Sequence, residues 1–375
     1  MKITVVGAGA FGSWSAYYLQ SAGHKVTLVD CYGPGNYKAS SGGESRMLRG
    51  IYGNNHQYIQ WTNRSLELWK AFQKQWGEQL YVNTGILWMF SEDDEFAKKS
   101  LPFLSEIDWP VEELTLTKTK KKYPQINLSD LKSFYFEPKA GFLRANYACK
   151  IVTENFLRIG GNYIQDKVIV DEKEKTLNFS SGSICNADQY IFCCGPWMKE
   201  LFPEILGDKI SPTRQEVFFF DCPKSLMLDN MPMWGDFGKD FHYGIPGSKY
   251  HGFKIANDAR GLFFDPETTL REPSKKMIKD AQEFASYRFP ILKSAKIIDS
   301  RVCQYENSPD EHLIIDNHPA LDNLLLVGGG SGHGFKMGPA VGEYICNLIA
   351  GEKKKKIFQL TRFNQQIKAG LTLPK

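Results

Sequence analysis

The chain has 375 residues, of which 42% are hydrophobic and 23% are charged, as in ordinary globular proteins. This length exceeds the usual size of a single core, so we expect one large α/β domain and a second lobe. The formal net charge of +4 is too small to indicate nucleic acid, and no apolar run approaches the ~20 residues of a membrane span, so we expect a soluble protein that binds neither nucleic acid nor membrane.

The N-terminal residues predict a βαβ unit. Two strands, Lys2–Val6 and Lys25–Asp30, enclose a GxGxxG run at residues 7–12 and an amphipathic run, Trp14–Gly23. Because the first apolar segment already begins at Ile3, it leaves no room ahead of it for a secretion leader, and we expect a cytoplasmic protein.

The context of the GxGxxG run is typical of a dinucleotide-binding turn, since a strand precedes it, a helix follows it and Asp30 closes the second strand. Gly7 permits the tight turn, Gly9 lets the backbone approach the pyrophosphate, and Gly12 allows close packing of helix on strand. The helix N-terminus offers N–H donors to the phosphates, and Asp30 would hold ribose hydroxyls. NAD and FAD both carry an ADP half, so this turn alone predicts either cofactor.

Two kinds of segment follow along the chain. After a helix predicted over Trp61–Trp76, strands rich in aromatic residues are typical of an antiparallel sheet that covers the nucleotide domain. These strands are Gly85–Phe90, Glu216–Phe220 and His251–Ile255. Segments typical of the nucleotide domain itself are two apolar strands that end in glycine and a late helix, namely Tyr190–Gly195, Leu324–Gly330 and Pro339–Ala350.

The order of these segments predicts an α/β fold with two domains. The first is a discontinuous Rossmann-like domain over residues 1–79, 139–209 and 293–375. The second is a substrate-binding or cover domain, built on an antiparallel sheet, over residues 80–138 and 210–292.

The eight cysteines show no CxxC pair and no Cys/His spacing of a metal site, so we expect reduced thiols and no bound metal. Cys193 and Cys194 fall in an apolar strand, where free cysteine behaves as a small hydrophobe. We therefore expect these two residues in the core rather than as a redox pair.

Several motifs, taken together, resemble the monomeric sarcosine oxidase and N-methyltryptophan oxidase family, within the D-amino acid oxidase-like flavoproteins. They lie at residues 43–49, 136–141, 195–197, 214–215, 243–246, 252–254, 303–316 and 328–336, and the likeness extends over nearly the whole chain. The resemblance implies that the nucleotide is FAD. It also implies that Cys303 is joined through its sulfur to the 8α-methyl group of the flavin, the alternative being that Cys303 is a buried small apolar residue.

The same resemblance implies roles for basic residues. Arg49 and Lys336 match the pair that binds the substrate carboxylate, and the alternative is two solvated surface cations. Arg46 would lie over the flavin face and favour the anionic reduced ring. Lys254 matches the lysine that promotes reduction of oxygen, and its alternative role is a charge at a strand edge.

Further positions follow from the resemblance. Tyr243 corresponds to a pocket tyrosine. The loop that contains Gly332, His333 and Gly334 would aim N–H donors at the flavin N1 and C2 carbonyl, with His333 as an orienting group rather than a base. Asp258 departs from the family pattern, which has a histidine there. This acid would either select a substrate with an added cationic or hydroxyl-bearing arm or form a salt bridge with Lys254 or Arg260.

We therefore predict an FAD-dependent oxidase, a monomer, that acts on a secondary amine or amino acid with an N-methyl, cyclic or other N-substituted nitrogen. Hydride transfer to flavin N5 would be followed by reaction with molecular oxygen, giving hydrogen peroxide and an imine that hydrolyses. Two alternatives stay open at this point. One is a dehydrogenase that passes electrons to a quinone or carrier, and the other is a flavin-binding protein without catalysis.

Overall fold

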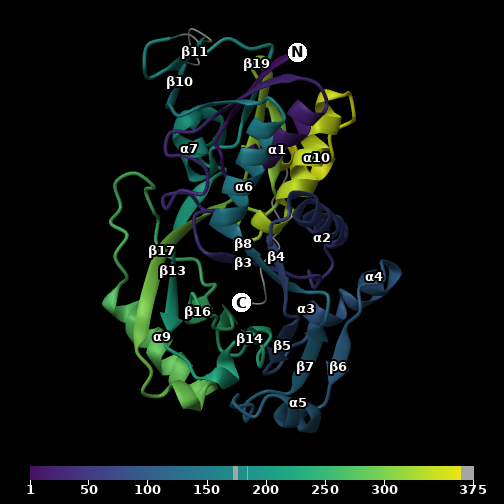
Figure 1. The fold of residues 1–375 in the computed structure, drawn as a ribbon, viewed down its shortest axis with the longest axis vertical. Coiled ribbons are helices and arrows are strands. Elements are labelled where there is room, and N and C mark those ends of the chain that lie inside the picture. Colours follow the sequence, from purple (N-terminus) through teal and green to yellow (C-terminus); the bar gives the residue numbers. More distant parts are fainter. Residues whose placement is uncertain (172–175, 184, 365–375) are drawn as a thin grey trace.

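The computed structural model describes residues 1–171, 176–183 and 185–364, so residues 365–375 of the predicted nucleotide domain lie outside the described part. Two large sheets lie at the two ends of the long axis of the molecule, and the purple and yellow ends of the chain meet in the upper half (Figure 1). A parallel, Rossmann-like sheet and a largely antiparallel second sheet confirm the predicted α/β fold class. The residue boundaries of the two domains stay a prediction.

The upper sheet carries the nucleotide-binding turn. Its strand order is β18-β19-β12-β1-β2-β9, and all its pairs are parallel except the antiparallel edge pair β18/β19. The strands are β1 (Lys2–Val6), β2 (Lys25–Val29), β9 (Asn162–Ile164), β12 (Gln189–Phe192), β18 (Ile314–His318) and β19 (Leu321–Gly328). Because β1 is apolar and almost wholly buried, it forms an inner strand, as its continuous hydrophobic run predicts.

The lower sheet has the order β17-β13-β16-β15-β14-β5-β7-β6 and is antiparallel apart from the parallel pair β14/β5. Its strands are β5 (Ile86–Phe90), β6 (Glu112–Leu114), β7 (Ser133–Glu137), β13 (Ser211–Phe220), β14 (Met233–Phe237), β15 (Phe241–Ile245), β16 (Phe253–Asn257) and β17 (Ile297–Asn307). The strand predicted over Glu216–Phe220 begins earlier, at Ser211, because β13 pairs with β17 along its whole length.

Two small sheets and the helices complete the described part. The small sheets are β3 (Ser45–Leu48), β8 (Gly141–Arg144) and β4 (Tyr81–Asn83), and the hairpin β10 (Val168–Asp171) with β11 (Thr176–Phe179). The helices are α1 (Ala10–Ser21), α2 (His56–Trp76), α3 (Glu95–Lys98), α4 (Leu101–Glu106), α5 (Leu116–Lys122), α6 (Ala145–Arg158), α7 (Met198–Leu201), α8 (Pro203–Leu206), α9 (Lys275–Arg288) and α10 (Gly338–Ile349).

Helix α1 begins at Ala10, four residues before the amphipathic run that predicted it. The chain turns at Gly7, whose φ is +100°, and the helix starts directly after Gly9. The second half of the glycine motif therefore forms the first helical turn. That turn lies so close to the strand end that a Cβ on Gly12 would be 1.7 Å from the Gly7 carbonyl oxygen.

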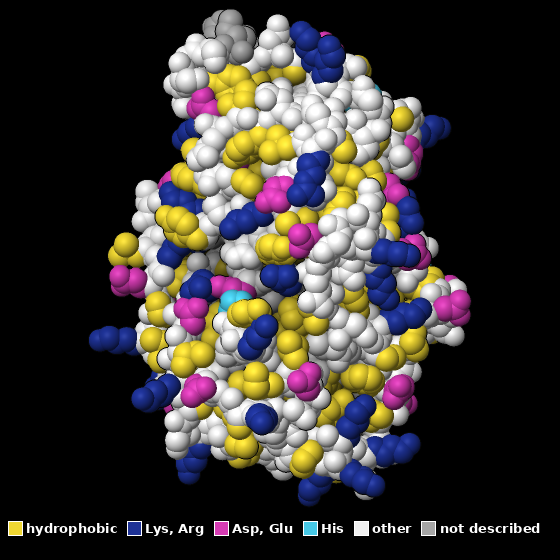
Figure 2. Space-filling model, viewed as in Figure 1, with side chains coloured by type: hydrophobic (Ala, Val, Ile, Leu, Met, Phe, Trp, Pro, Cys, Tyr) yellow, Lys and Arg dark blue, Asp and Glu magenta, His cyan; other side chains and the backbone are white. Residues whose placement is uncertain are grey.

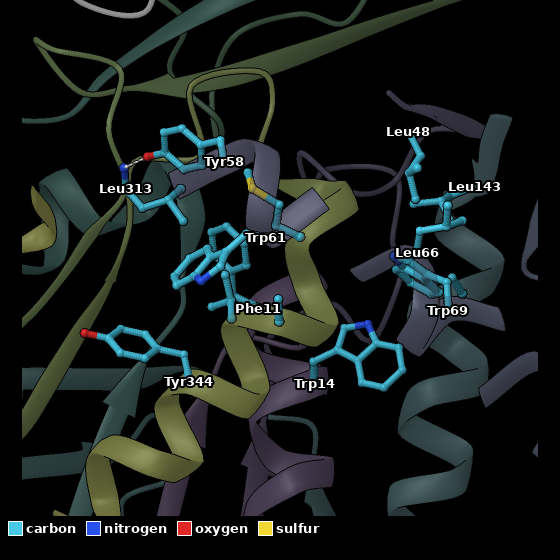
Figure 3. Close-up of a cluster of buried hydrophobic side chains, with 14 of the residues drawn as sticks. Phe11, Trp14, Leu48, Tyr58, Trp61, Leu66, Trp69, Leu143, Leu313 and Tyr344 are labelled. Atoms are coloured by element: carbon cyan, nitrogen blue, oxygen red, sulfur yellow. Dashed lines mark hydrogen bonds between the residues drawn. The ribbon is translucent and has the colours of Figure 1, made fainter. Parts of the chain in front are cut away.

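An aromatic core fixes α1 in this position. Trp14 of α1 is stacked on Trp76 at a centroid distance of 5.6 Å and lies edge-on to Trp69 at 5.2 Å. Figure 3 shows Phe11 and Trp14 of α1 among labelled side chains from α2 and from α10. Such ring pairs add to the free energy gained by removing the rings from water. The core thereby holds the N-terminus of α1 at the cavity described below.

Candidate functional site

A cavity of about 390 Å³ lies beside the turn that follows β1. Its lining includes Gly7 and Gly9 of the turn, Asp30 after β2, and Tyr305 and Glu306 of β17. Residues from both large sheets therefore line one space, as expected for a cofactor that crosses a domain interface.

The glycine turn has the shape of a phosphate cradle. A Cβ on Gly7 would lie 2.4 Å from the Cys193 carbonyl oxygen, so only glycine fits there. Gly9 lines the cavity and immediately precedes α1, whose first N–H groups have no partner within the helix. These donors and the helix dipole suit a pyrophosphate, so the turn fits the ADP half of FAD.

Asp30 lies at the same cavity and already accepts three backbone N–H bonds. Its Oδ2 accepts from Ala8 at 2.7 Å, and its Oδ1 accepts from Tyr32 at 2.8 Å and from Gly33 at 2.7 Å. Burial raises the pKa of this carboxyl, and the three backbone bonds oppose the shift. A carboxylate has about four lone-pair sites, so it keeps capacity for a ribose hydroxyl.

The predicted core cysteines lie at the edge of the same cavity. Cys193 is buried, whereas Cys194 is half-buried, and both line the space. Burial raises the pKa of both thiols. Both are free thiols, and for Cys193 the buried position is confirmed.

Cys303 lies on β17, where it pairs with Gln215 of β13. Its sulfur is 3.5 Å from Nη2 of Arg46, and the same Arg46 guanidinium donates to the Ser45 carbonyl oxygen at 2.7 Å and to that of Ser40. Arg46 and Ser40 both line the 390 Å³ cavity. The structure thus brings Cys303 and Arg46 together from segments 257 residues apart.

A second cavity, of about 90 Å³, adjoins the first. The two share four lining residues, Arg46, Tyr305, Gly332 and Phe335. The smaller one is also lined by the remaining predicted catalytic and pocket residues, namely Arg49, Tyr243, Lys254, Asp258, His333 and Lys336. Gly334 lines the larger cavity.

Arg49 and Lys336 both contact Tyr52. The Lys336 ammonium donates to the Tyr52 hydroxyl at 2.6 Å and to the His333 carbonyl oxygen at 2.8 Å. The Arg49 guanidinium lies 4.3 Å from the Tyr52 ring centroid and donates to the Ile51 carbonyl oxygen. Burial, followed by the Arg49 charge, lowers the pKa of Lys336 well below its usual range. An anion bound between the two cations would offset that cost.

The segment that follows Arg49 is fixed by Glu137, a buried residue of β7. Its Oε2 accepts the Gly50 N–H at 2.6 Å and the Trp109 indole N–H at 2.7 Å, and its Oε1 accepts the Trp88 indole N–H at 2.6 Å. A carboxylate with three short donors is well satisfied, so it fixes the loop rather than reacting. Glu137 lies in one of the motifs that carry the family resemblance, but its role becomes visible only in the fold.

Lys254 lies on β16 with only 4% of its surface exposed. Its ammonium is 3.3 Å from the Ser45 carbonyl oxygen. Burial, followed by the Arg46 charge, lowers the pKa of Lys254 to about 7. Lys254 is therefore a buried cation at the cavity wall, not a charge at a strand edge.

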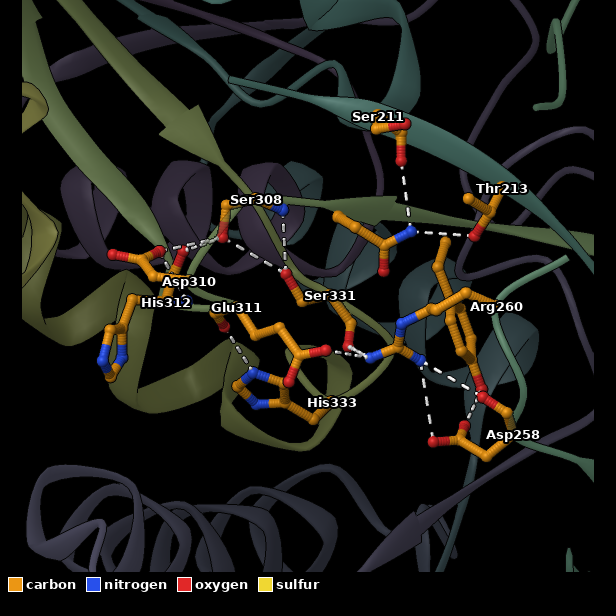
Figure 4. Close-up of polar contacts among 12 residues, drawn as sticks. Ser211, Thr213, Asp258, Arg260, Ser308, Asp310, Glu311, His312, Ser331 and His333 are labelled. Carbon is orange, nitrogen blue, oxygen red and sulfur yellow. Dashed lines mark hydrogen bonds and ion pairs between the residues drawn. The ribbon is translucent and has the colours of Figure 1, made fainter. Parts of the chain in front are cut away.

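Asp258 takes part in a polar chain at the cavity wall (Figure 4). Its Oδ1 accepts from the Tyr305 hydroxyl at 2.9 Å, and Tyr305 is 3.2 Å from the Tyr243 hydroxyl. Its Oδ2 lies 3.6 Å from the Arg260 guanidinium, which also donates to Glu311 at 2.7 Å. Burial raises the pKa of Asp258, and Arg260 opposes the shift. Of the two alternatives, the ion pair with Arg260 is present, and Asp258 still lines the cavity.

His333 lies between Glu311 and Tyr52 in the glycine-rich loop. Its Nε2 is 2.9 Å from the Glu311 carbonyl oxygen, which can only accept, so Nε2 carries the proton. Its Nδ1 lies 3.4 Å from the Tyr52 hydroxyl. Burial, and then the Lys336 charge, lowers the pKa of His333 well below its usual range, so the ring is neutral.

Three residues of the site were not singled out from the sequence: Tyr52, Tyr305 and Glu306. Tyr305 could have been found, because it lies two residues after Cys303 and side chains alternate along a strand. Glu306 lies in the motif at residues 303–316, but that motif gave it no role, and Tyr52 carries no local signal. Among the described residues, no group of three or more His, Cys, Asp and Glu side chains could hold a metal ion.

The face of the molecule in Figure 2 shows no comparable cluster of cations. On the face in Figure 2, basic and acidic side chains are interspersed over much of the surface. None of the helices in the described ranges combines the length and the apolar character that crossing a membrane requires.

A family model and a curated relative each match most of the chain. The model of a family described as FAD dependent oxidoreductase matches residues 2–348. N-methyl-L-tryptophan oxidase of Yersinia pestis (strain Pestoides F) is 28% identical over 376 residues, covering 96% of this chain and 99% of that protein.

Solved structures share the fold. L-proline dehydrogenase from P. horikoshii superimposes with a TM-score of 0.83 at 22% identity, covering 97% of both chains. Glycine oxidase from Geobacillus kaustophilus gives a TM-score of 0.80 at 19% identity, covering 96% of this chain and 98% of that one.

Proposed function

Because the chain belongs to the FAD-dependent oxidoreductase family, whose model spans residues 2–348, we propose that it oxidises the carbon–nitrogen bond of a secondary amino acid, with oxygen as electron acceptor. Enzymes of this kind act on amines or amino acids. The N-methyl-L-tryptophan oxidase that is 28% identical over nearly the whole chain supports a substrate whose nitrogen is N-methylated, cyclic or otherwise N-substituted.

The single observation that carries the proposal is the pair of cations in the smaller cavity. Arg49 and Lys336 lie around Tyr52, and this cavity shares a wall with the dinucleotide-binding cavity. A substrate carboxylate that loses its hydration needs paired cationic donors. With the acid group held there, the carbon–nitrogen bond of an amino acid is directed toward the shared wall.

When bound, FAD supplies the acceptor for the hydride on the carbon beside the substrate nitrogen and the route by which two electrons reach oxygen. The chain's own residues bind and orient the substrate. The nitrogen must also be uncharged, so its proton has to leave. We assign that proton to Asp258, which is reached through the Tyr305 hydroxyl that donates to its Oδ1; burial raises the pKa of Asp258 and so favours its protonated form.

Lys254 supports oxygen as the electron acceptor. In its ammonium form Lys254 places a positive charge at the wall of the substrate cavity, where reduction of oxygen creates negative charge. A dehydrogenase that gives electrons to a quinone or carrier is the second candidate, and the acceptor test below separates the two.

The experiment that tests the function uses the visible absorbance of the bound flavin. Without oxygen, N-methyl and cyclic amino acids should bleach it faster than primary D- or L-amino acids of the same size. When air is admitted, oxygen uptake should match hydrogen peroxide formed. Bleaching by none of these compounds would contradict the proposal, and bleaching followed by reoxidation only with a quinone would favour the dehydrogenase.

We also propose that Cys303 holds the flavin by a thioether. The support is the Arg46 guanidinium 3.5 Å from the sulfur, since a neighbouring cation is typical of reactive cysteines. Protein precipitated with acid should give a yellow pellet, whereas Cys303→Ala should release all its flavin to the supernatant. Cys222→Ala, at another half-buried free thiol, is the matched control and should keep the yellow pellet. A colourless pellet from the unaltered protein would contradict the link.

A further inference from the structure

Glu306 of β17 carries a buried carboxyl oxygen that no described residue satisfies. The residue is 7% exposed and lines the 390 Å³ cavity. Its Oε1 accepts the Gly330 N–H at 3.1 Å, whereas its Oε2 has no hydrogen-bond partner within residues 1–171, 176–183 and 185–364. A buried polar atom without a partner costs folding free energy, so its retention at a cavity wall points to a ligand atom.

Two glycines border the buried Glu306 carboxyl at positions where a larger residue would crowd it. An added Cβ would lie 3.5 Å from Oε2 at Gly195 and 2.9 Å from Oε1 at Gly330. Both glycines line the cavity, and Gly195 follows β12, next to the strand that leads into the phosphate turn. Glu306 therefore lines the cavity between Gly195, beside the strand that leads into the phosphate turn, and Gly330 of the glycine-rich loop.

We propose that Oε2 of Glu306 binds an oxygen atom of the chain that joins the two ring systems of FAD, either a hydroxyl of the polyol or an oxygen of the pyrophosphate. The inference rests on the proposed FAD-dependent function. It adds a contact that the glycine motif does not contain, because Glu306 comes from the other large sheet.

The protonation state of Glu306 follows from its neighbours. The titratable groups that face it are the thiols of Cys193 and Cys194, and Gly330 donates a backbone N–H, but no cation contributes. Burial raises the pKa of Glu306 to about 7. A nearby pyrophosphate would raise it further, so the bound form is the neutral acid, which donates its O–H to the ligand.

If the neutral acid is the form that binds, the affinity for FAD should decrease as the pH rises. Because the acid form binds FAD, the affinity is full below a pKa of about 7 and falls as the pH rises through it. The fall approaches about tenfold per pH unit, the slope for uptake of one proton.

The experiment measures FAD dissociation constants from flavin fluorescence between pH 6 and 9. A Cys303→Ala background is used, so that no thioether retains the cofactor. In this background the affinity should fall by up to about 100-fold between pH 7 and 9. With Glu306→Gln added, which keeps a neutral donor of the same shape, the fall attributable to Glu306 should disappear. Lys254 titrates in the same range, but it is present in both proteins, so their difference isolates Glu306.

The matched control is Glu216→Gln, at a buried glutamate of β13 that is bonded to Arg214 and Ser274 and lines neither cavity. It should keep the full pH dependence. If the affinity for FAD falls equally with pH in the proteins with and without Glu306→Gln, the inference is overturned. Because Gln has the same shape as Glu, the variant should still fold.

Fragments of the cofactor locate the contact. Glu306→Leu should weaken FAD binding at pH 6 by about tenfold, the loss of one hydrogen bond. An equal loss for riboflavin assigns the contact to the polyol, and an equal loss for ADP assigns it to the pyrophosphate. Unchanged FAD affinity in a folded Glu306→Leu protein would overturn the inference. Absence of FAD binding in every protein, including the one with Cys303 intact, would instead overturn the proposed function.

Discussion

Replacing Lys254 by methionine should slow the reaction of the reduced protein with oxygen by on the order of 100- to 1,000-fold, the effect of removing one preorganised group that faces developing charge. Reduction by the substrate should change only a few-fold, because Lys254 is not part of the carboxylate-binding pair. Methionine has a similar length and fills the space left by the lysine stem in this buried position.

The pH dependence of the oxygen reaction provides a second readout. The ammonium form of Lys254 predominates below a pKa of about 7, so the rate constant with oxygen should fall as the pH rises through that value. Lys254→Met should lose this dependence. Stopped-flow traces of the two half-reactions check the prediction, and equal slowing of reduction and reoxidation would contradict it.

Replacing Arg49 or Lys336, the proposed carboxylate-binding pair, should impair reduction of the flavin by the substrate about as strongly as Lys254→Met impairs reaction with oxygen. Lys336→Met or Arg49→Met should weaken substrate binding by on the order of 100- to 1,000-fold, because each change leaves a desolvated carboxylate with half its partners. Reaction of the reduced protein with oxygen should change little. The two lysine variants therefore serve as reciprocal controls, since both replace a buried ammonium in the same cavity.

An amine that lacks the carboxylate tests the cause of this loss. For such a compound the unaltered protein and Lys336→Met should reduce the flavin with similar apparent affinity. Burial and Arg49 lower the pKa of Lys336, so binding of a carboxylate should take up a proton, and substrate affinity should fall as the pH rises. An equal loss for the carboxylate-free amine would show that Lys336 maintains the cavity rather than binding the acid group.

The site concentrates cations at the cost of stability. Arg46, Arg49, Lys254 and Lys336 all line the smaller cavity, and the pKa values of both lysines are lowered. Mutual repulsion and burial disfavour their charged forms in the absence of an anion. A cavity of this kind favours anionic ligands and offers the positive charge that both proposed half-reactions need.

Local motifs alone determined the family, the fold class and the glycine cradle. The family model over residues 2–348 confirms the resemblance that was found from short motifs. Gly7 and Gly12 could be assigned from the sequence because their requirements are local: a positive φ, and a helix turn in contact with the preceding strand end. Spacing along the chain encodes such constraints directly.

Only the tertiary structure decided which distant side chains meet. Lys336 reaches Tyr52 across 284 residues, and Tyr305 of β17 reaches Asp258 across 47 residues. The free oxygen of Glu306 is likewise a property of the fold, because it depends on what the other sheet leaves empty around it. A contact between segments far apart in the chain is set by sheet order and packing, and no local pattern of residue types carries that information.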